Sequence, residues 1–185
     1  MERLRHVEPS IEYMEQGIDY IQEHINVGSR INGSGGLDRY LDNYQGWLDK
    51  LEQDRRCIPN EQRVPAETYY LVREEDNKII GMINIRLVLN DRLRKCGGHI
   101  GYGIRPSERQ KGYNKINLYL ALLRCQELGI KEETINFLHE EEQKIKEIYP
   151  DKIDLKSGTL NINGATVECL GEDYTPTEGY NDGIK

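Results

Sequence analysis

The residues best suited to chemistry lie between Pro106 and Lys115, where an expected strand passes through a tight turn into a helix. The first turn of a helix presents unpaired backbone N–H groups and the positive end of the helix dipole, and both favour phosphate oxygens. Arg109 and Lys111 add positive charge, as does Lys115, and Gly112 leaves room for a ligand beside the backbone. The pattern predicts an anion-binding turn, with a solvated basic helix start as the alternative.

Metal and redox chemistry have little support in the sequence. The four cysteines contain no CxxC pair and have no histidine at ligand spacing. They are Cys57, Cys96, Cys125 and Cys169. The histidines are equally scattered: His6, His24, His99 and His139. We therefore expect no metal site and no metal cofactor.

The turn is positioned by a strand expected at 97–105 and a helix expected at 113–128, which Gly129 closes at its C′ position. Hydrophobic periodicity predicts the other elements. They are a helix at 11–25 capped by Ser10, a helix at 37–54, and strands at 68–73 and 78–89. Such an order predicts helices that flank a mostly antiparallel sheet.

The chain changes character after Gly129. An acidic helix is expected at 131–149, stopped by Pro150. Two alternating runs at 159–170 surround Asn163-Gly164, a pair typical of a type I′ hairpin turn. We predict that this hairpin packs on the edge of the strand at 97–105, because soluble proteins seldom leave such an edge open.

Length and charge exclude several classes of protein. A chain of 185 residues fits one domain. The net charge of −7 disfavours a nucleic-acid or anionic-membrane surface, which needs clustered Lys and Arg. No apolar run approaches the roughly 20 residues of a membrane span, and no apolar signal core follows the first residues. We expect a cytoplasmic protein with neither nucleic acid nor a membrane as partner.

The stretch GGHIGYGIRPSERQKGY, residues 97–113, resembles the acetyl-coenzyme A signature of the GNAT superfamily of N-acetyltransferases. The family pattern is Gln/Arg-x-x-Gly-x-Gly/Ala between a strand and a helix, and it begins here at Arg109. The resemblance continues over about 31–129 through INGSGGLDRY, RVPAETYYLVR and IIGMINIR. These segments cover more than half of the chain.

The resemblance implies an α+β fold with three layers, a mostly antiparallel central sheet that splays beside Ile104, and acetyl-CoA as co-substrate. The pantetheine arm would pair with backbone at Tyr102, Gly103 and Ile104. The pyrophosphate would lie on the turn, with these residues as the implied contacts: Arg109, Gln110, Lys111, Gly112, Tyr113, Asn114 and Lys115. A neutral amine would then attack the thioester directly, with backbone N–H groups steadying the oxyanion.

Two residues are candidates for catalysis. His99 lies on the strand that often carries a general base in this family, although strand alternation turns it away from Tyr102 and Ile104 unless a glycine bulge resets the register. Tyr102 lies on the better face. A structural or surface role is the alternative for His99, and core packing or pantetheine contact is the alternative for Tyr102.

The sequence departs from the family pattern at two places. Asn114 stands where Gly or Ala is usual, and its side chain either crowds the phosphates or supplies a hydrogen bond. After Gly129, EETINFLHEEEQKIKEIYP replaces the apolar strand and the Asn-containing helix that usually helps to protonate the thiolate. We therefore expect slow turnover, or none, even where the cofactor binds.

Several functional hypotheses remain open. The first is an N-acetyltransferase that acetylates a primary amine of a small molecule or peptide. The second is a non-catalytic relative that binds acyl-CoA or serves as an interaction module. The third is a family-like segment, 1–129, joined to a C-terminal third of unrelated origin. We expect a single domain over 1–170, divergent over 130–170, then a flexible tail at 171–185. Both a monomer and a homodimer are compatible with the sequence.

Overall fold

A computed structural model gives the fold. It describes residues 3–95 and 97–130, without the side chain of Lys95, and further along the chain the backbone of four strands. These are β5 (Ile135–Leu138), β6 (Leu155–Lys156), β7 (Thr159–Ile162) and β8 (Ala165–Leu170).

The first sheet contains four antiparallel strands in the order β1-β2-β3-β4. They are β1 (Leu4–Val7), β2 (Ala66–Arg73), β3 (Lys78–Arg86) and β4 (Ile100–Ile104). Strands β2 and β3 form the hairpin expected from their β-branched and aromatic residues. The strand β4 is therefore an edge strand of this sheet.

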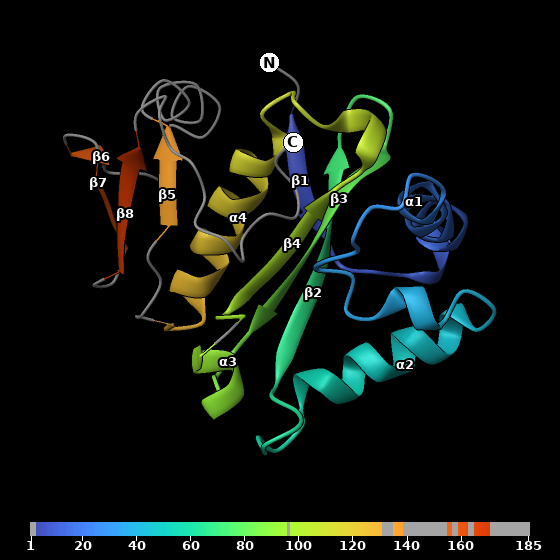
Figure 1. Ribbon diagram of the computed structural model, residues 1–185, viewed down its shortest axis with the longest axis horizontal. Helices are drawn as coiled ribbons and strands as arrows, with labels where there is room; N and C mark the ends of the chain where they lie inside the picture. The colour runs from blue at the N-terminus through green and yellow to red at the C-terminus, as the bar shows by residue number, and fades with distance from the viewer. Residues whose placement is uncertain are drawn as a thin grey trace.

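Helices cover both faces of the sheet, as Figure 1 shows: α1 and α2 lie on one side and α4 on the other. The helices are α1 (Met14–Asn26), α2 (Tyr44–Arg55), the short α3 (Asp91–Lys95) and α4 (Tyr113–Glu127). The arrangement confirms the expected three-layer α+β fold.

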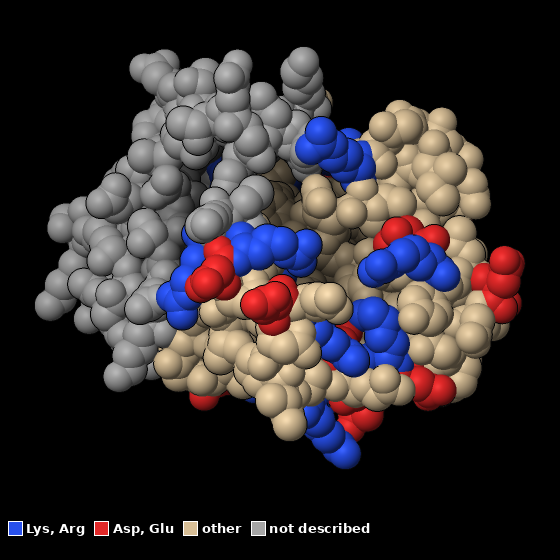
Figure 2. All heavy atoms as spheres, turned by 60° about the horizontal axis from the view of Figure 1, so that its bottom comes forward, with Lys and Arg blue, Asp and Glu red and all other residues tan. Residues whose placement is uncertain are grey.

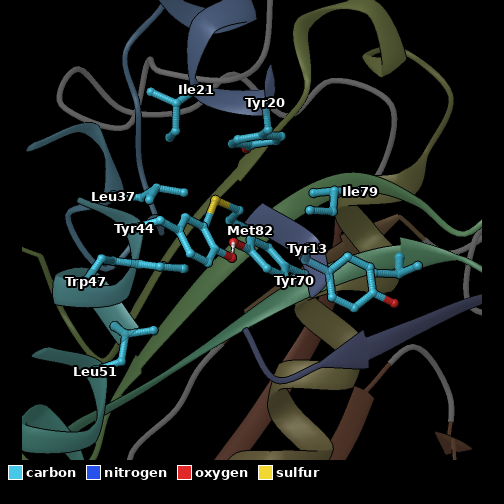
Figure 3. Close-up of a cluster of buried hydrophobic side chains, with 11 residues drawn as sticks. Tyr13, Tyr20, Ile21, Leu37, Tyr44, Trp47, Leu51, Tyr70, Ile79 and Met82 are labelled. Atoms are coloured by element: carbon cyan, nitrogen blue, oxygen red, sulfur yellow. Dashed lines mark hydrogen bonds between the residues drawn. The ribbon is translucent and has the colours of Figure 1, made fainter. Parts of the chain in front are cut away.

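The layer between α1, α2 and the sheet is rich in tyrosine and also contains the one tryptophan, in a chain that has a single phenylalanine. Trp47 and Tyr70 are fully buried at its centre, and the hydroxyls of Tyr70 and Tyr44 are 2.7 Å apart (Figure 3). On the other face, α4 packs Ile116, Leu122 and its other apolar residues against Leu71 and Ile80. Both faces of the sheet are thus sealed by helices.

The expected helices differ from the structure at their starts. Ser10 precedes a 3-10 turn, and its side chain makes no capping hydrogen bond. The helix expected over 37–54 is wrong at its first residues, because α2 begins only at Tyr44. Asn43 caps α2 by accepting a hydrogen bond from Gly46 N at 3.0 Å. The helix therefore starts at this cap and does not extend back to Leu37, as the spacing of the apolar residues predicted.

Two expectations about the C-terminal third are wrong. A strand, β5, follows Gly129, so 131–149 is not one helix and a strand after α4 is not missing. The hairpin is confirmed, since β7 and β8 pair antiparallel up to Ile162 and Ala165. It does not join β4, however, but belongs to a second sheet with the order β5-β8-β7-β6. The turn residues 163–164 and the tail 171–185 lie outside the described residues.

The second sheet takes its strand partners from within the C-terminal third. Strand β5 runs parallel to β8, and β7 comes close to α4. The hairpin was expected to complete the edge of β4, and this prediction is wrong. Strand β8 has apolar residues at alternate positions and pairs with β5 as its second neighbour. Among the described strands, only β3 pairs with β4.

Candidate functional site

The turn between β4 and α4 has an unusual backbone. After a 3-10 turn at Pro106–Glu108, Gln110 has a φ of 63° and Gly112 a φ of 82°. Glycine adopts this left-handed region readily, but a glutamine there carries strain, which proteins tend to keep at functional positions. In the part of the chain that the structure describes, the backbone N–H groups of Gln110 and Gly112 have no hydrogen-bond acceptor.

Two of the expected cationic side chains are bound within the protein. Arg109 donates from Nε to the carbonyl of Ile104 at 3.1 Å and from Nη2 to Ser29 Oγ at 2.6 Å. The ammonium of Lys111 lies 2.7 Å from a carboxylate oxygen of Glu108. Both side chains therefore hold the turn in shape, and the donors without an acceptor in the described residues are backbone N–H groups.

Glu108 organises the base of the turn. Its side chain is only 6% exposed, yet it meets Lys78 Nζ at 2.8 Å, Lys111 Nζ at 2.7 Å and Arg73 Nη1 at 3.3 Å. Burial alone would raise the pKa of this carboxyl, but the bonds from Lys111 and Lys78 outweigh burial and lower the pKa to about 2. The carboxylate therefore stays charged and ties the turn to the β2–β3 hairpin.

Arg105 ties the same turn to α1. Its guanidinium is almost fully buried, 2.6 Å from Asp19 Oδ2 and 2.8 Å from Glu23 Oε2. The other oxygen of Glu23 accepts a hydrogen bond from Ser107 N at 2.6 Å. Charge-assisted bonds of this kind are stronger than neutral ones, so the end of β4 is fixed on both sides.

The expected pantetheine contacts alternate along β4. Tyr102 packs toward α4, and Ile104 is buried on the same side of the sheet. Gly103 faces α1, where a Cβ would lie 3.0 Å from Asn32 O and 3.1 Å from Tyr20 Oη. Because the pairs Arg86–His99 and Ile80–Arg105 are hydrogen-bonded, ladder alternation directs the backbone N–H and C=O of Tyr102 and Ile104 toward the outer edge.

The remaining residues of the turn, Tyr113, Asn114 and Lys115, have different contacts. Tyr113 is buried in the α4 core, and its hydroxyl accepts a hydrogen bond from Arg73 at 3.3 Å. The side-chain oxygen of Asn114 is buried without a partner among the described residues. Rotation of that amide by 180° would present Nδ2, a donor that suits a phosphate oxygen. Lys115 begins the helical bonding, donating its N–H to Gly112 O at 3.2 Å.

His99 lies at the opposite end of β4 from the turn. Its ring Nδ1 is 2.7 Å from the carbonyl oxygen of Arg86. A carbonyl oxygen only accepts, so Nδ1 carries a proton, and in the neutral form of the ring the lone pair lies on Nε2. The backbone N–H of Arg86 in turn donates to His99 O at 2.8 Å. The ring is thus held in an orientation that suits a base, and it lies away from the turn between β4 and α4.

A cavity of about 290 Å³ opens beside His99. Four of its seven lining residues have aliphatic side chains, and Arg94 and His99 supply the polar side chains. It is lined by Leu87, Val88, Leu89, Arg94, His99, Gly129 and Ile130. Figure 2, which brings the lower side of Figure 1 forward, shows Lys and Arg side chains on several sides of a hollow. The acidic balance of the whole chain therefore does not extend to every surface.

Sequence reasoning singled out the motif residues but missed the residues that hold them. From sequence, Glu108 is simply a carboxylate near a helix start, where the helix dipole favours it, whereas the structure buries it among three cations. Arg105 was counted only as the end of a strand. Nothing in the local pattern marks either residue, because their partners lie on the β2–β3 hairpin and on α1.

The described residues offer neither a metal centre nor a membrane-spanning helix. No group of three or more His, Cys, Asp or Glu side chains there is arranged to hold a metal ion. No helix of that part of the chain is both long and apolar enough to cross a membrane.

Comparison with known proteins gives one match. The family profile described as "Acetyltransferase (GNAT) family" matches residues 37–145. The match includes β2, β3, β4, the turn and α4, and it continues past Gly129 through β5. No curated protein and no solved structure matches the chain.

Proposed function

The chain belongs to the GNAT acetyltransferase family, whose members are generally acyltransferases, and on that premise we propose that it transfers an acetyl group from acetyl-CoA to a primary amine. The observation that carries the proposal is the turn before α4. At its left-handed residues, Gln110 and Gly112, two backbone N–H groups have no acceptor among the described residues, just before a fifteen-residue helix. This arrangement suits a pyrophosphate.

Binding would use the backbone more than the side chains. The N–H groups of Gln110 and Gly112 lack acceptors in the described part of the chain, and the buried amide of Asn114 lacks a partner for its oxygen. The backbone N–H and C=O of Tyr102 and the N–H of Ile104 lie on the outer edge of β4, a placement that suits the amides of a pantetheine arm, while Ile104 O accepts a hydrogen bond from Arg109 Nε. Arg109 and Lys111 would support the turn through Ser29 and Glu108.

His99 is our choice for the base. An amine must lose a proton to attack a thioester, and a neutral imidazole whose Nδ1–H is bound to Arg86 O presents Nε2 for that proton. As the C–N bond forms and the C–S bond breaks, the amine's proton passes to the base and another proton reaches the departing thiolate. Tyr102 packs toward α4 and would act through pantetheine contact.

The decisive measurement is calorimetric titration of the protein with coenzyme A. Gly112→Val should abolish binding, because valine is strained at a φ of 82° and distorts the turn. Gly28→Val is the matched control, since Gly28 also has a positive φ but lies in open space. It should lose stability to a similar extent and still bind. A wild-type protein that gives no heat with coenzyme A contradicts the proposal.

Turnover tests the catalytic half of the proposal. With a panel of primary amines, His99→Gln should lower kcat by about 10²- to 10⁴-fold, the usual contribution of a general base. Its coenzyme A affinity should stay unchanged, because His99 and the turn lie at opposite ends of β4. A His99→Gln enzyme with wild-type kcat over the whole pH range would remove His99 from the mechanism.

A further inference from the structure

We propose that the cavity beside His99 receives the acceptor, and that the acceptor is a small amine with an apolar body and a carboxylate that Arg94 binds. The inference rests on the proposed function and names its substrate class. The two polar side chains of the cavity wall, Arg94 and His99, supply complementary roles. One is a permanent cation, and the other is a base held in a fixed tautomer.

Arg94 is suited to bind an anion of a ligand. In the described part of the chain no carboxylate forms an ion pair with it, and its backbone N–H donates to Asn90 O at 3.0 Å. A guanidinium matches a carboxylate in a planar, bidentate geometry. Three arginines near the sheet have carboxylate partners: Arg73 with Asp76, Arg105 with Asp19, and Arg124 with Glu67.

The segment that carries Arg94 is built rigidly for so short a helix. Asn90 caps α3 by accepting from Leu93 N at 3.0 Å, while its Nδ2 donates to the carbonyls of Asn60 and Glu61 at 3.0 Å. At the other end Gly98 N donates to Leu93 O at 3.0 Å. These bonds fix α3 between the connector before β2 and the residues that precede β4, so Arg94 and His99 keep their spacing.

The rest of the wall selects an apolar body of limited size. Leu87, Val88 and Leu89 continue from the end of β3, and Ile130 closes the cavity from the end of α4. A volume of about 290 Å³ is at the small end for small-molecule sites, roughly 300–1,000 Å³. An amine the size of a free amino acid fits this description, with its carboxylate on Arg94 and its amino group at His99.

The test uses ligands that differ only in the carboxylate: leucine and leucinamide, and phenylalanine and phenylalaninamide. Their binding to the full chain is measured by calorimetry, which needs no turnover. The wild-type protein should bind the amino acids about tenfold or more tightly than the amides, as expected for a charged hydrogen-bonded pair. Arg94→Gln should remove the preference, and Arg94→Lys should restore part of it.

Arg92→Gln is the control, because Arg92 lies on the same helix, is exposed, and does not line the cavity. It should keep the preference. An Arg94→Gln protein that still prefers the carboxylate overturns the inference, as does a wild-type protein that binds the amides equally well. Coenzyme A is titrated into the same samples. Binding of coenzyme A without binding of any amino acid contradicts this inference alone, whereas binding of amino acids without coenzyme A contradicts only the proposed function.

Discussion

The guanidinium of Arg109 donates a hydrogen bond to Ser29 Oγ at 2.6 Å, and this contact joins two segments 80 residues apart in the sequence. Ser29 belongs to the segment that follows α1, and Arg109 opens the turn before α4. The same guanidinium holds the last carbonyl of β4, that of Ile104, at 3.1 Å. The first residue of the family motif thus connects the turn, the sheet and the α1 side of the molecule.

Ser29→Ala should weaken that connection without removing it. The loss of one hydrogen bond to a charged group should reduce the free energy of unfolding by about 1–2 kcal/mol in urea titrations. Arg109→Met should reduce it further, because the bond to Ile104 O is lost as well. Coenzyme A affinity should fall in the same order. Equal stability of both variants and the wild type would mean that the contact contributes nothing.

Gly33→Ala should be among the most damaging glycine substitutions in the chain. A Cβ there would lie 2.7 Å from Gly101 O and 2.8 Å from Met82 O, both backbone atoms of the sheet, at a φ of +74°. Gly28→Ala, at a φ of +65° with nothing within 4 Å, isolates the cost of the conformation, which is about 1 kcal/mol. We expect the Gly33 variant to unfold at least about 2 kcal/mol more easily than the Gly28 variant.

Glu108→Gln should destabilise the protein at neutral pH and less so in strong acid. The pKa of Glu108 is lowered to about 2, so its charge stabilises the fold above about pH 4.5, and that stabilisation is lost as the pH falls through 2. At pH 7 the loss should be roughly 1–3 kcal/mol. Chemical unfolding at several pH values should show the stabilities of the two proteins converging as the pH falls from about 4.5 to about 2. Glu75→Gln, an exposed change in the β2–β3 turn, should behave like wild type throughout.

His6 should make the fold sensitive to mild acid. Burial lowers the pKa of His6 to about 4, although its bond to Asn117 Oδ1 at 2.9 Å opposes the shift. The unfolded chain binds the proton near pH 6.5, so stability is complete above that pH and is lost as the pH falls from 6.5 through 4. His6→Gln keeps a donor for Asn117 and should flatten the slope of stability against pH in this interval. An unchanged slope would show that another group is responsible.

The sequence alone predicted the elements that depend on local pattern. The β-branched runs of β2 and β3, the apolar stripe of α4 and the glycine after it form as expected, because each depends on residues within a few positions of one another. The motif from Arg109 to Gly112 also revealed the turn and the family. The pair Asn163-Gly164 also predicted that β7 would pair with β8, because a short loop brings its two strands together.

Only the tertiary structure decided where these pieces meet. The partners of Glu108 are 30 and 35 residues away at Lys78 and Arg73, and Asp19, a partner of Arg105, is 86 residues away. No periodicity encodes such distances, because they follow from how α1, the hairpin and the turn pack around one sheet. The tertiary structure also decided that β8 pairs with β5 and not with β4. It also turned the Nδ1 of His99 toward Arg86, which made a scattered histidine a candidate base.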